Sequence, residues 1–258
     1  MNSSGKRFSI VIPCAKLLNS GMQGEFGPIP SGLVPLGGKV AIEKIIESFG
    51  GSDFDVYIGV EEGANFVEEY FAFFPDPRVK IAVLENSTSI SDTIEKIFGK
   101  YPAILQGPVV LNFADTIVGD LEPGLFGRDF ISYSRKIETE RWTLFKFDSS
   151  KIIEISDKEY QDDLAPWFVF VGVWGFKDAE AFYRLLQEEN RKNNKKAFYE
   201  CIKKYAVSSS DMELFETQEW IDCGYVDNYY SAKRKMVATR FFNNVTHYCP
   251  NVEDERAR

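Results

Sequence analysis

Short runs of apolar residues alternate with amphipathic stretches in the first half of the chain. An apolar run next to a turn signal is typical of a buried strand, whereas apolar residues at helical spacing predict a helix. By these criteria we predict strands at 8–13, 56–60, 79–84 and 109–113, and helices at 40–49, 64–74 and 91–98. This alternation predicts an α/β fold with a mostly parallel central sheet flanked by helices.

The pattern changes after residue 119. Segments at 130–134, 143–147 and 152–155 have the alternation of antiparallel strands, which predicts a small antiparallel insertion. A strongly apolar strand at 167–176 contains Gly172, and a glycine inside a strand indicates a bulge or a close approach of backbone or ligand. The remaining predicted elements are helices at 179–189, 196–205 and 226–235 and a short strand at 219–224.

The chain shows no internal repeat and no low-complexity linker. We therefore predict one domain over residues 1–240. Residues 241–258 are polar and form either a C-terminal tail or the start of a second module.

Residues 14–38 are rich in glycine and proline, which excludes a long helix or strand. A loop of this length inside a compact domain is usually functional. Glycine-rich loops bind phosphates through their backbone N–H groups. The position of this loop, directly after the first strand, therefore favours a phosphate-containing ligand.

The 258 residues carry a net charge of −9, which argues against nucleic acid or an anionic membrane surface as a partner. No stretch of 18 apolar residues and no signal peptide is present, so we expect a cytoplasmic protein without membrane insertion. Four scattered cysteines give no zinc-binding spacing. An acidic protein that binds phosphates needs a metal, backbone N–H groups and a few placed lysines.

Asp115 follows the apolar strand at 109–113. Open α/β sheets bind ligands at the carboxyl ends of their strands, and a carboxylate there is a natural Mg²⁺ ligand. The plainer alternative for Asp115 is a turn or capping residue.

Four motifs follow one another along the chain. The first strand leads into the glycine-rich loop, which ends in PSGLVPLGGK at 30–39; Ala114-Asp115-Thr116 ends a later strand, and WIDCG occupies 220–224. Over about residues 8–240 this arrangement resembles the nucleotidyltransferase family that includes the sugar-phosphate and phosphocholine nucleotidylyltransferases.

The resemblance implies a Rossmann-like, GT-A-like fold and a reaction. An NTP, with CTP or UTP favoured, gives its nucleotidyl group to a sugar-1-phosphate or a small phosphorylated alcohol, and pyrophosphate is released. Chemistry of this kind depends on positioning and charge neutralisation rather than on a protein nucleophile.

The resemblance also implies roles for individual residues. Asp115 and Asp222 would hold Mg²⁺, and Lys16 would act with them as a catalytic residue. The positions implied for nucleotide binding are Cys14, Ala15, Gly21, Gly24, Glu85, Ser89 and Ser91, and those for acceptor binding are Lys158 and Gly172. Plainer alternatives stay open: solvated lysines at Lys16 and Lys158, and a helix cap at Ser89 or Ser91.

The loop departs from the family pattern, because residues 21–26 contain no Arg and Pro30-Ser31 stands where the family has Pro-Lys. A catalytically inactive nucleotide-binding relative is therefore one alternative. A metal-dependent glycosyltransferase is another, although that class carries an Asp-x-Asp motif and Ala114-Asp115-Thr116 supplies a single Asp.

Segments at 222–225, 228–231 and 239–243 resemble those of capsule and surface-polysaccharide proteins. The resemblance implies a role in surface glycan biosynthesis. Whether the chain forms a homo-oligomer stays open.

Overall fold

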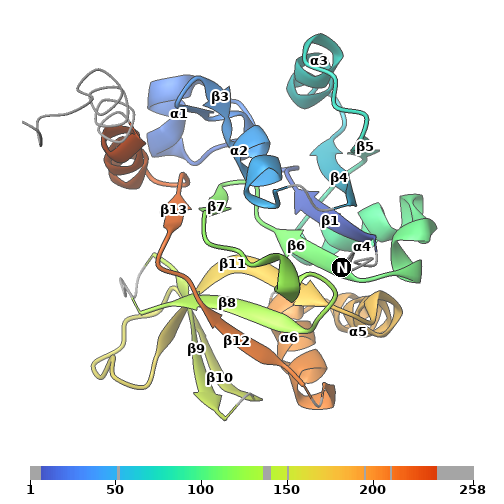
Figure 1. Ribbon diagram of the computed structural model, residues 1–258, viewed down its shortest axis with the longest axis vertical. Coiled ribbons are helices and arrows are strands. Elements are labelled where there is room, and N and C mark those ends of the chain that lie inside the picture. The colour runs from blue at the N-terminus through green and yellow to red at the C-terminus, as the bar shows by residue number, and fades with distance from the viewer. Residues whose placement is uncertain are drawn as a thin grey trace, which may run out of the picture.

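A computed structural model describes residues 7–50, 53–135, 141–149, 151–194, 196–209 and 211–236. Its centre is a nine-stranded sheet with the order β10-β9-β11-β6-β1-β4-β5, in which β8 lies beside β11 and β12 beside β8 (Figure 1). The parallel strands are β6 (Val109–Asn112), β1 (Phe8–Pro13), β4 (Phe54–Glu61) and β5 (Val79–Leu84). Their apolar runs made these strands predictable, and the predicted α/β fold with a parallel centre is confirmed.

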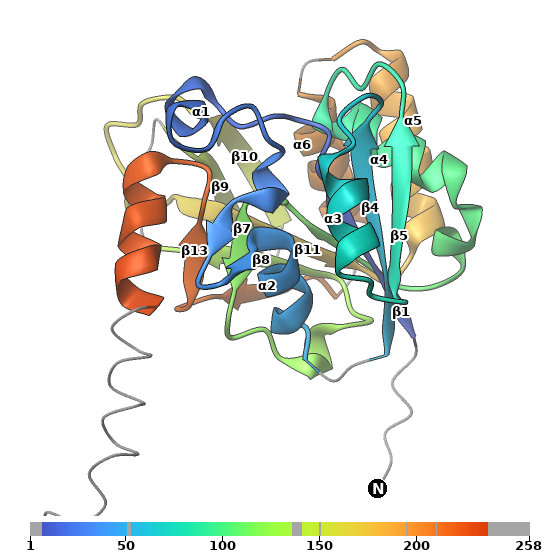
Figure 2. The same ribbon diagram turned by 90° about the horizontal axis from the view of Figure 1, so that it is seen from above.

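Helices cover both faces of the parallel strands. In Figure 2, α2 (Ala41–Ser48) and α3 (Phe66–Phe73) lie on the viewer's side, and α4 (Ile90–Lys100), α5 (Ala179–Arg191) and α6 (Ala197–Ser208) lie behind. Ile10 and Ile12 of β1 belong to the apolar cluster that includes α2, whereas Val11 belongs to the cluster of α4, α5 and α6. The alternation of side chains along a strand thus gives one sheet two cores.

The predicted antiparallel insertion is present in the lower half of Figure 1. The strand β11 (Phe168–Phe176) runs antiparallel to β6, β8 and β9, and β9 pairs antiparallel with β10. These partners are β8 (Phe130–Ser134), β9 (Thr143–Asp148) and β10 (Lys151–Asp157). The strand β12 (Glu213–Glu216), parallel to β8, was not predicted, because its four half-buried residues form no apolar run.

Two small sheets lie outside the main one. The strand β7 (Thr116–Val118) pairs antiparallel with β13 (Trp220–Asp222), and β2 (Pro35–Leu36) pairs with β3 (Lys39–Val40). The pairing of β7 with β13 is the contact that brings the late segment of the chain to the carboxyl end of β6.

The glycine-rich stretch contains a short helix that the sequence did not predict, α1 (Ser20–Phe26). Asn19 caps it by accepting a hydrogen bond from the Met22 backbone N–H at 3.1 Å, and the Met22 side chain is fully buried. The cap and this anchor offset the cost of about 1 kcal/mol that each glycine brings to a helix. The described residues also include 3₁₀ turns at Ser31–Leu33, Pro102–Gln106 and Pro123–Leu125.

Residues 226–236 are helical, and the proposed tail at 241–258 lies outside the described residues. Among the described residues, no helix has both the length and the apolar character needed to cross a bilayer.

Candidate active site

A cavity of about 440 Å³ opens where β1 and β6 end. The strand β1 has β4, the next strand of this sheet along the chain, as one neighbour, and β6 as its other neighbour. This is the topological switch point at which α/β sheets bind ligands, and the volume is typical of a small-molecule site. The cavity is lined by residues 16–20, 141–143 and 170–172, by the turn after β6, and by the segment around Asp222.

Asp115 and Asp222 face each other in this cavity. The β7–β13 pairing sets Asp222 opposite Thr116, and the Cys223 backbone N–H donates to the Asp115 carbonyl at 2.8 Å. A Cβ atom on Gly224 would lie 2.9 Å from Asp115 Oδ2 and 3.0 Å from Asp222 Oδ1, so these oxygens are no more than about 6 Å apart. The structure thus joins two carboxylates separated by more than a hundred residues of sequence, and Gly224 leaves the space between them open.

Burial and, second to it, the negative charge of Asp222 together raise the pKa of Asp115 from 3.8 to about 6. The backbone N–H of Asp115, the Lys158 ammonium and the Thr116 hydroxyl lower the pKa in part. Two carboxylates in this arrangement favour a proton or a cation between them.

This pair of carboxylates fits Mg²⁺. Mg²⁺ is usually held by one or two carboxylates together with substrate phosphates, rather than by a complete cage of protein ligands. In the described part of the chain, no group of three or more His, Cys, Asp or Glu side chains is arranged to hold a metal ion. Asp115 and Asp222 would be the protein ligands, and phosphate oxygens would complete the shell.

Among the residues that the structure describes, the cationic side chains that line the cavity are Lys16, Lys158 and Arg141. Lys16 comes from the loop after β1, and Lys158 follows β10 with a positive φ of 59°. Arg141 was not predicted from the sequence. Its Nη1 donates to Asp227 Oδ2 at 2.7 Å, and its guanidinium lies 5.3 Å from the centre of the Tyr225 ring. Arg141 therefore brings a cation, ion-paired with Asp227, to the cavity from the segment before β9.

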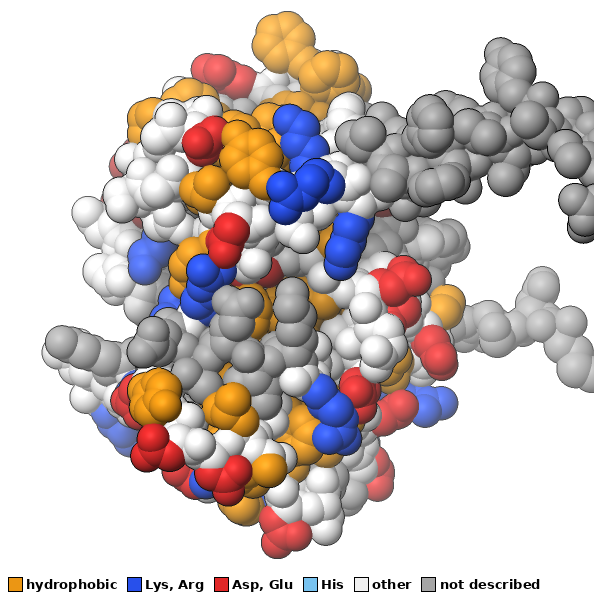
Figure 3. Space-filling view, turned by 90° about the vertical axis from the view of Figure 1, so that its left-hand side faces the viewer, with side chains coloured by type: hydrophobic (Ala, Val, Ile, Leu, Met, Phe, Trp, Pro, Cys, Tyr) orange, Lys and Arg blue, Asp and Glu red, His pale blue; other side chains and the backbone are white. Residues whose placement is uncertain are grey.

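The net charge is unevenly distributed over the surface. Figure 3 shows the face on which α1 and the 226–236 helix lie, where several Lys and Arg side chains lie in the upper half among a few Asp and Glu, and most of the Asp and Glu side chains lie in the lower half.

No family model and no curated protein matches the chain, whereas many solved structures share its architecture. A UDP-glucose pyrophosphorylase in complex with UDP-glucose has a TM-score of 0.70 at 13% identity, covering 90% of this chain and 99% of that one. The CTP:phosphocholine cytidylyltransferase of Streptococcus pneumoniae has a TM-score of 0.65 at 16% identity, covering 89% and 99%. The inositol-1-phosphate CTP transferase of T. maritima has a TM-score of 0.64 at 15% identity, covering 90% and 97%. The chain has the nucleotidyltransferase fold.

Gly172 lies in the wall of the cavity that this fold forms. Its φ is +89°, and a Cβ at this position would lie 2.9 Å from the Phe113 ring and 3.2 Å from Thr116 Oγ1. The pairing of β11 with β8 shifts register between Phe170 and Trp174, which is a bulge. The predicted close approach is therefore confirmed as an approach of β11 to the turn after β6, and a side chain there would displace that turn.

The loop after β1 departs from the expected open phosphate cradle. Gly21 and Gly24 lie within α1, and Cys14 is buried beneath the loop, with its backbone N–H donating to the Gly59 carbonyl at 2.8 Å. Burial raises the pKa of the Cys14 thiol to about 12. Ala15 follows as the half-buried link to Lys16, which lines the cavity. The part of the loop that lines the cavity is therefore residues 16–20 and Ser31.

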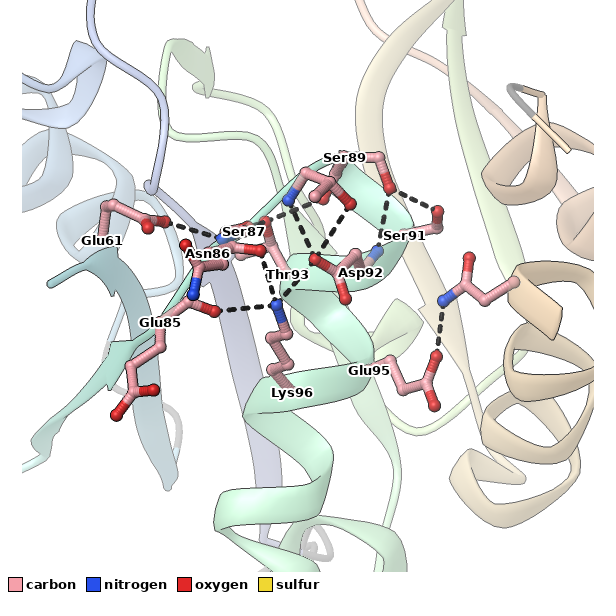
Figure 4. Close-up of polar contacts among 12 residues, drawn as sticks. Glu61, Glu85, Asn86, Ser87, Ser89, Ser91, Asp92, Thr93, Glu95 and Lys96 are labelled. Carbon is pink, nitrogen blue, oxygen red and sulfur yellow. Dashed lines mark hydrogen bonds and ion pairs between the residues drawn. The ribbon is translucent and has the colours of Figure 1, made fainter. Parts of the chain in front are cut away.

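Glu85, Ser89 and Ser91 lie outside the lining of the 440 Å³ cavity: Glu85 and Ser89 are on the turn that leads into α4, and Ser91 is in the first turn of that helix (Figure 4). Ser89 is the N-cap of α4: its Oγ accepts from the Asp92 backbone N–H at 3.1 Å and lies 2.9 Å from Ser91 Oγ. Lys96 Nζ donates to the Glu85 carbonyl at 2.9 Å and to Asp92 Oδ2 at 2.8 Å. The hydroxyl and amide groups of this turn thus bond largely to one another, while the exposed Glu85 carboxylate points away from them.

Aromatic residues form much of the remaining wall, and sequence reasoning assigned no role to any of them. They are Phe113, Trp142, Phe170, Tyr199, Trp220 and Tyr225. Phe113, Phe170 and Trp220 come from segments with an apolar core pattern, and Trp142 and Tyr225 from polar stretches, so the sequence carried no signal that marks any of these rings as lining a cavity.

Proposed function

We propose that the chain transfers a nucleotidyl group from an NTP to the phosphate of a sugar-1-phosphate or a small phosphorylated alcohol, with Mg²⁺ as cofactor. The observation that carries the proposal is the Asp115–Asp222 pair, open between its oxygens and located at the switch point of a nucleotidyltransferase fold. CTP and UTP are the first nucleotides to test, because two of the similar structures are CTP-dependent transferases and another binds UDP-glucose. Surface glycan biosynthesis is the cellular role that the sequence resemblance favours.

In the proposed reaction an oxygen of the acceptor phosphate attacks the α-phosphorus of the NTP. The new P–O bond forms as the bond from the α-phosphorus to the bridging oxygen breaks, and pyrophosphate leaves with that electron pair. A bound Mg²⁺ would neutralise charge on the phosphates. Neither bond change requires a protein nucleophile or a proton transfer, so positioning is the main task of the protein.

The cationic residues divide this task according to their places in the cavity. We assign the triphosphate to Lys16, on the loop after β1, and the acceptor phosphate to Lys158, which follows β10; both side chains line the cavity. Arg141 enters from the segment that leads into β9 and can replace part of the charge that the loop lacks. This third cation favours an active enzyme over an inactive nucleotide-binding relative.

The test is pyrophosphate release from each NTP with Mg²⁺ and a panel of acceptors: sugar-1-phosphates, inositol-1-phosphate and phosphocholine. We expect one NTP–acceptor pair to turn over, and Asp115→Asn and Asp222→Asn to lower its rate by about 100-fold or more, because metal binding supplies several kcal/mol. Asp53→Asn is the matched control. Asp53 is exposed and directly precedes β4, at the amino end of a strand, whereas the cavity lies at the carboxyl ends of β1 and β6, so its replacement should leave the rate unchanged.

The alternatives give different results in the same experiment. NTP binding without pyrophosphate release from any pair would identify an inactive relative. Transfer or hydrolysis from a nucleotide sugar without pyrophosphate would identify a glycosyltransferase.

A further inference from the structure

Hydrogen bonding distinguishes the two carboxylate oxygens of Asp222. Oδ2 accepts from Trp142 Nε1 at 2.7 Å and from Asn228 Nδ2 at 3.1 Å. Among the described residues, Oδ1 accepts from the Gly224 backbone N–H alone, at 2.7 Å. A carboxylate oxygen offers two lone pairs, so Oδ2 is filled and Oδ1 keeps one acceptor position. Oδ1 is also the oxygen that faces Asp115 Oδ2 across Gly224.

The Trp142 indole is fixed in place. The side chain is buried, in a small apolar cluster with Leu144, Trp167 and Val169, and its ring centre lies 4.9 Å from that of Trp220. A tryptophan side chain has two rotatable bonds, so packing on this scale fixes the direction of the N–H group. A hydrogen bond from a fixed donor to an ionised acceptor is strong and directional, and it therefore orients the carboxylate.

Burial of an indole does not by itself require such a partner in this protein. The buried Nε1 atoms of Trp174 and Trp220 have no hydrogen-bond partner among the described residues. Trp220 lines the same cavity as Trp142. The bond from Trp142 to Asp222 is thus a specific feature of the site.

We propose that Trp142 is a positioning residue for Asp222. Its indole N–H, together with the Asn228 amide, holds Oδ2 and turns Oδ1 toward Asp115, where a divalent cation would bind both carboxylates. The inference rests on the metal role given to Asp222 in the proposed function. It adds that the geometry of the site is set from two further elements, the segment before β9 and the 226–236 helix.

The test is the affinity for Mn²⁺ alone, measured by the EPR signal of the free ion, without nucleotide and without turnover. Trp142→Phe keeps an aromatic ring and removes the N–H group, and we expect it to weaken Mn²⁺ binding by about 10-fold or more, as partners of metal ligands commonly do. Asn228→Leu removes the other donor to Oδ2 and should weaken binding to a smaller extent. Trp174→Phe is the matched control: it makes the same chemical change in the core, away from the cavity, and should leave the affinity unchanged.

The outcomes separate this inference from the proposed function. If Asp222→Asn loses Mn²⁺ but Trp142→Phe and Asn228→Leu bind it as the unaltered protein does, the positioning role is wrong and the metal role of Asp222 stands. If the unaltered protein binds no Mn²⁺, the metal site itself is wrong. Circular dichroism checks that each variant folds; if Trp142→Phe does not, Asn228→Leu decides, because a weakened affinity supports the positioning role and an unchanged one overturns it.

Discussion

The residue that combines function and stability most directly is Asp115. Its side chain is half-buried beside Asp222, and its pKa lies at about 6 rather than at 3.8. The folded protein therefore binds this proton more tightly than the unfolded chain does. The stability that the protonated form gives is fully present below about pH 4 and is lost as the pH rises through 6.

We expect Asp115→Asn to stabilise the metal-free protein above pH 6. The amide keeps the shape of the side chain and removes the buried charge, so the gain at pH 8 should be roughly 3 kcal/mol, from about two pKa units at about 1.4 kcal/mol each. The gain should shrink as the pH falls and vanish below about pH 4. Thermal unfolding with EDTA at several pH values measures it.

A gain independent of pH would show that shape rather than charge is responsible, and a loss of stability would contradict the prediction. Added Mg²⁺ should stabilise the unaltered protein and not Asp115→Asn. Such a variant is an example of the trade-off between stability and activity at a functional site.

At the scale of elements, a helix or strand could be predicted when its own residues stabilise it, and could not when a distant partner does. The strands β1, β4 and β6 are mostly buried on both faces, so their apolar runs are visible in the sequence. The strand β5, at the end of the sheet, is only partly buried but has an apolar run of the same kind. The short strands β7 and β12 form through pairing with β13 and β8, and a three- or four-residue segment carries little signal of a partner so far along the chain. The helix α1 was hidden by its glycines, because the Asn19 cap and the burial of Met22 appear only in the folded chain.

The N-terminus of α4 gives a prediction at this scale. Ser89→Ala removes the side chain that accepts the Asp92 backbone N–H, so it should lower the free energy of unfolding by about 1 kcal/mol. Denaturant unfolding measures the change. Ser208→Ala, in the last turn of α6, is the control and should stay within about 0.5 kcal/mol, because its hydroxyl donates to the Tyr205 carbonyl rather than capping an N-terminus. An equal loss in both variants would argue against the cap, and the nucleotide affinity of Ser89→Ala shows whether this residue also contacts the ligand.

At the scale of the whole molecule, the candidate site is assembled from both halves of the sheet. Asp115 follows β6, a strand of the parallel half, and Asp222 is the last residue of β13. The antiparallel half contributes Arg141, Trp142 and Lys158. The resemblance to a family pointed to Asp115, Asp222 and Lys158. It could not point to Arg141 or Trp142, because nothing in a polar stretch before a strand tells which residues the fold turns toward a cavity.

The overall charge makes the metal decisive for nucleotide binding. The chain carries a net charge of −9, and the cavity adds two carboxylates no more than about 6 Å apart. Two unit charges about 6 Å apart interact by roughly 3 kcal/mol at an effective dielectric constant near 20. A triphosphate bound at a similar distance from either carboxylate would be repelled to this extent, unless a cation lies between the carboxylate and the phosphates. Removing the metal with EDTA should therefore weaken binding of the preferred NTP by about 10-fold or more, as measured by titration calorimetry.

Asp222→Asn should change the affinity for the NTP in opposite directions in the two buffers. With Mg²⁺ the variant loses a metal ligand and should bind the NTP more weakly than the unaltered protein. With EDTA it lacks one repelling charge and should bind the NTP more tightly than the unaltered protein does under the same conditions. Asp53→Asn, which removes an equal charge at the amino end of β4, away from the cavity, should follow the unaltered protein in both buffers. A variant that is weaker in both buffers would mean that Asp222 binds the nucleotide through contacts of its own, because loss of a metal ligand alone predicts the crossover.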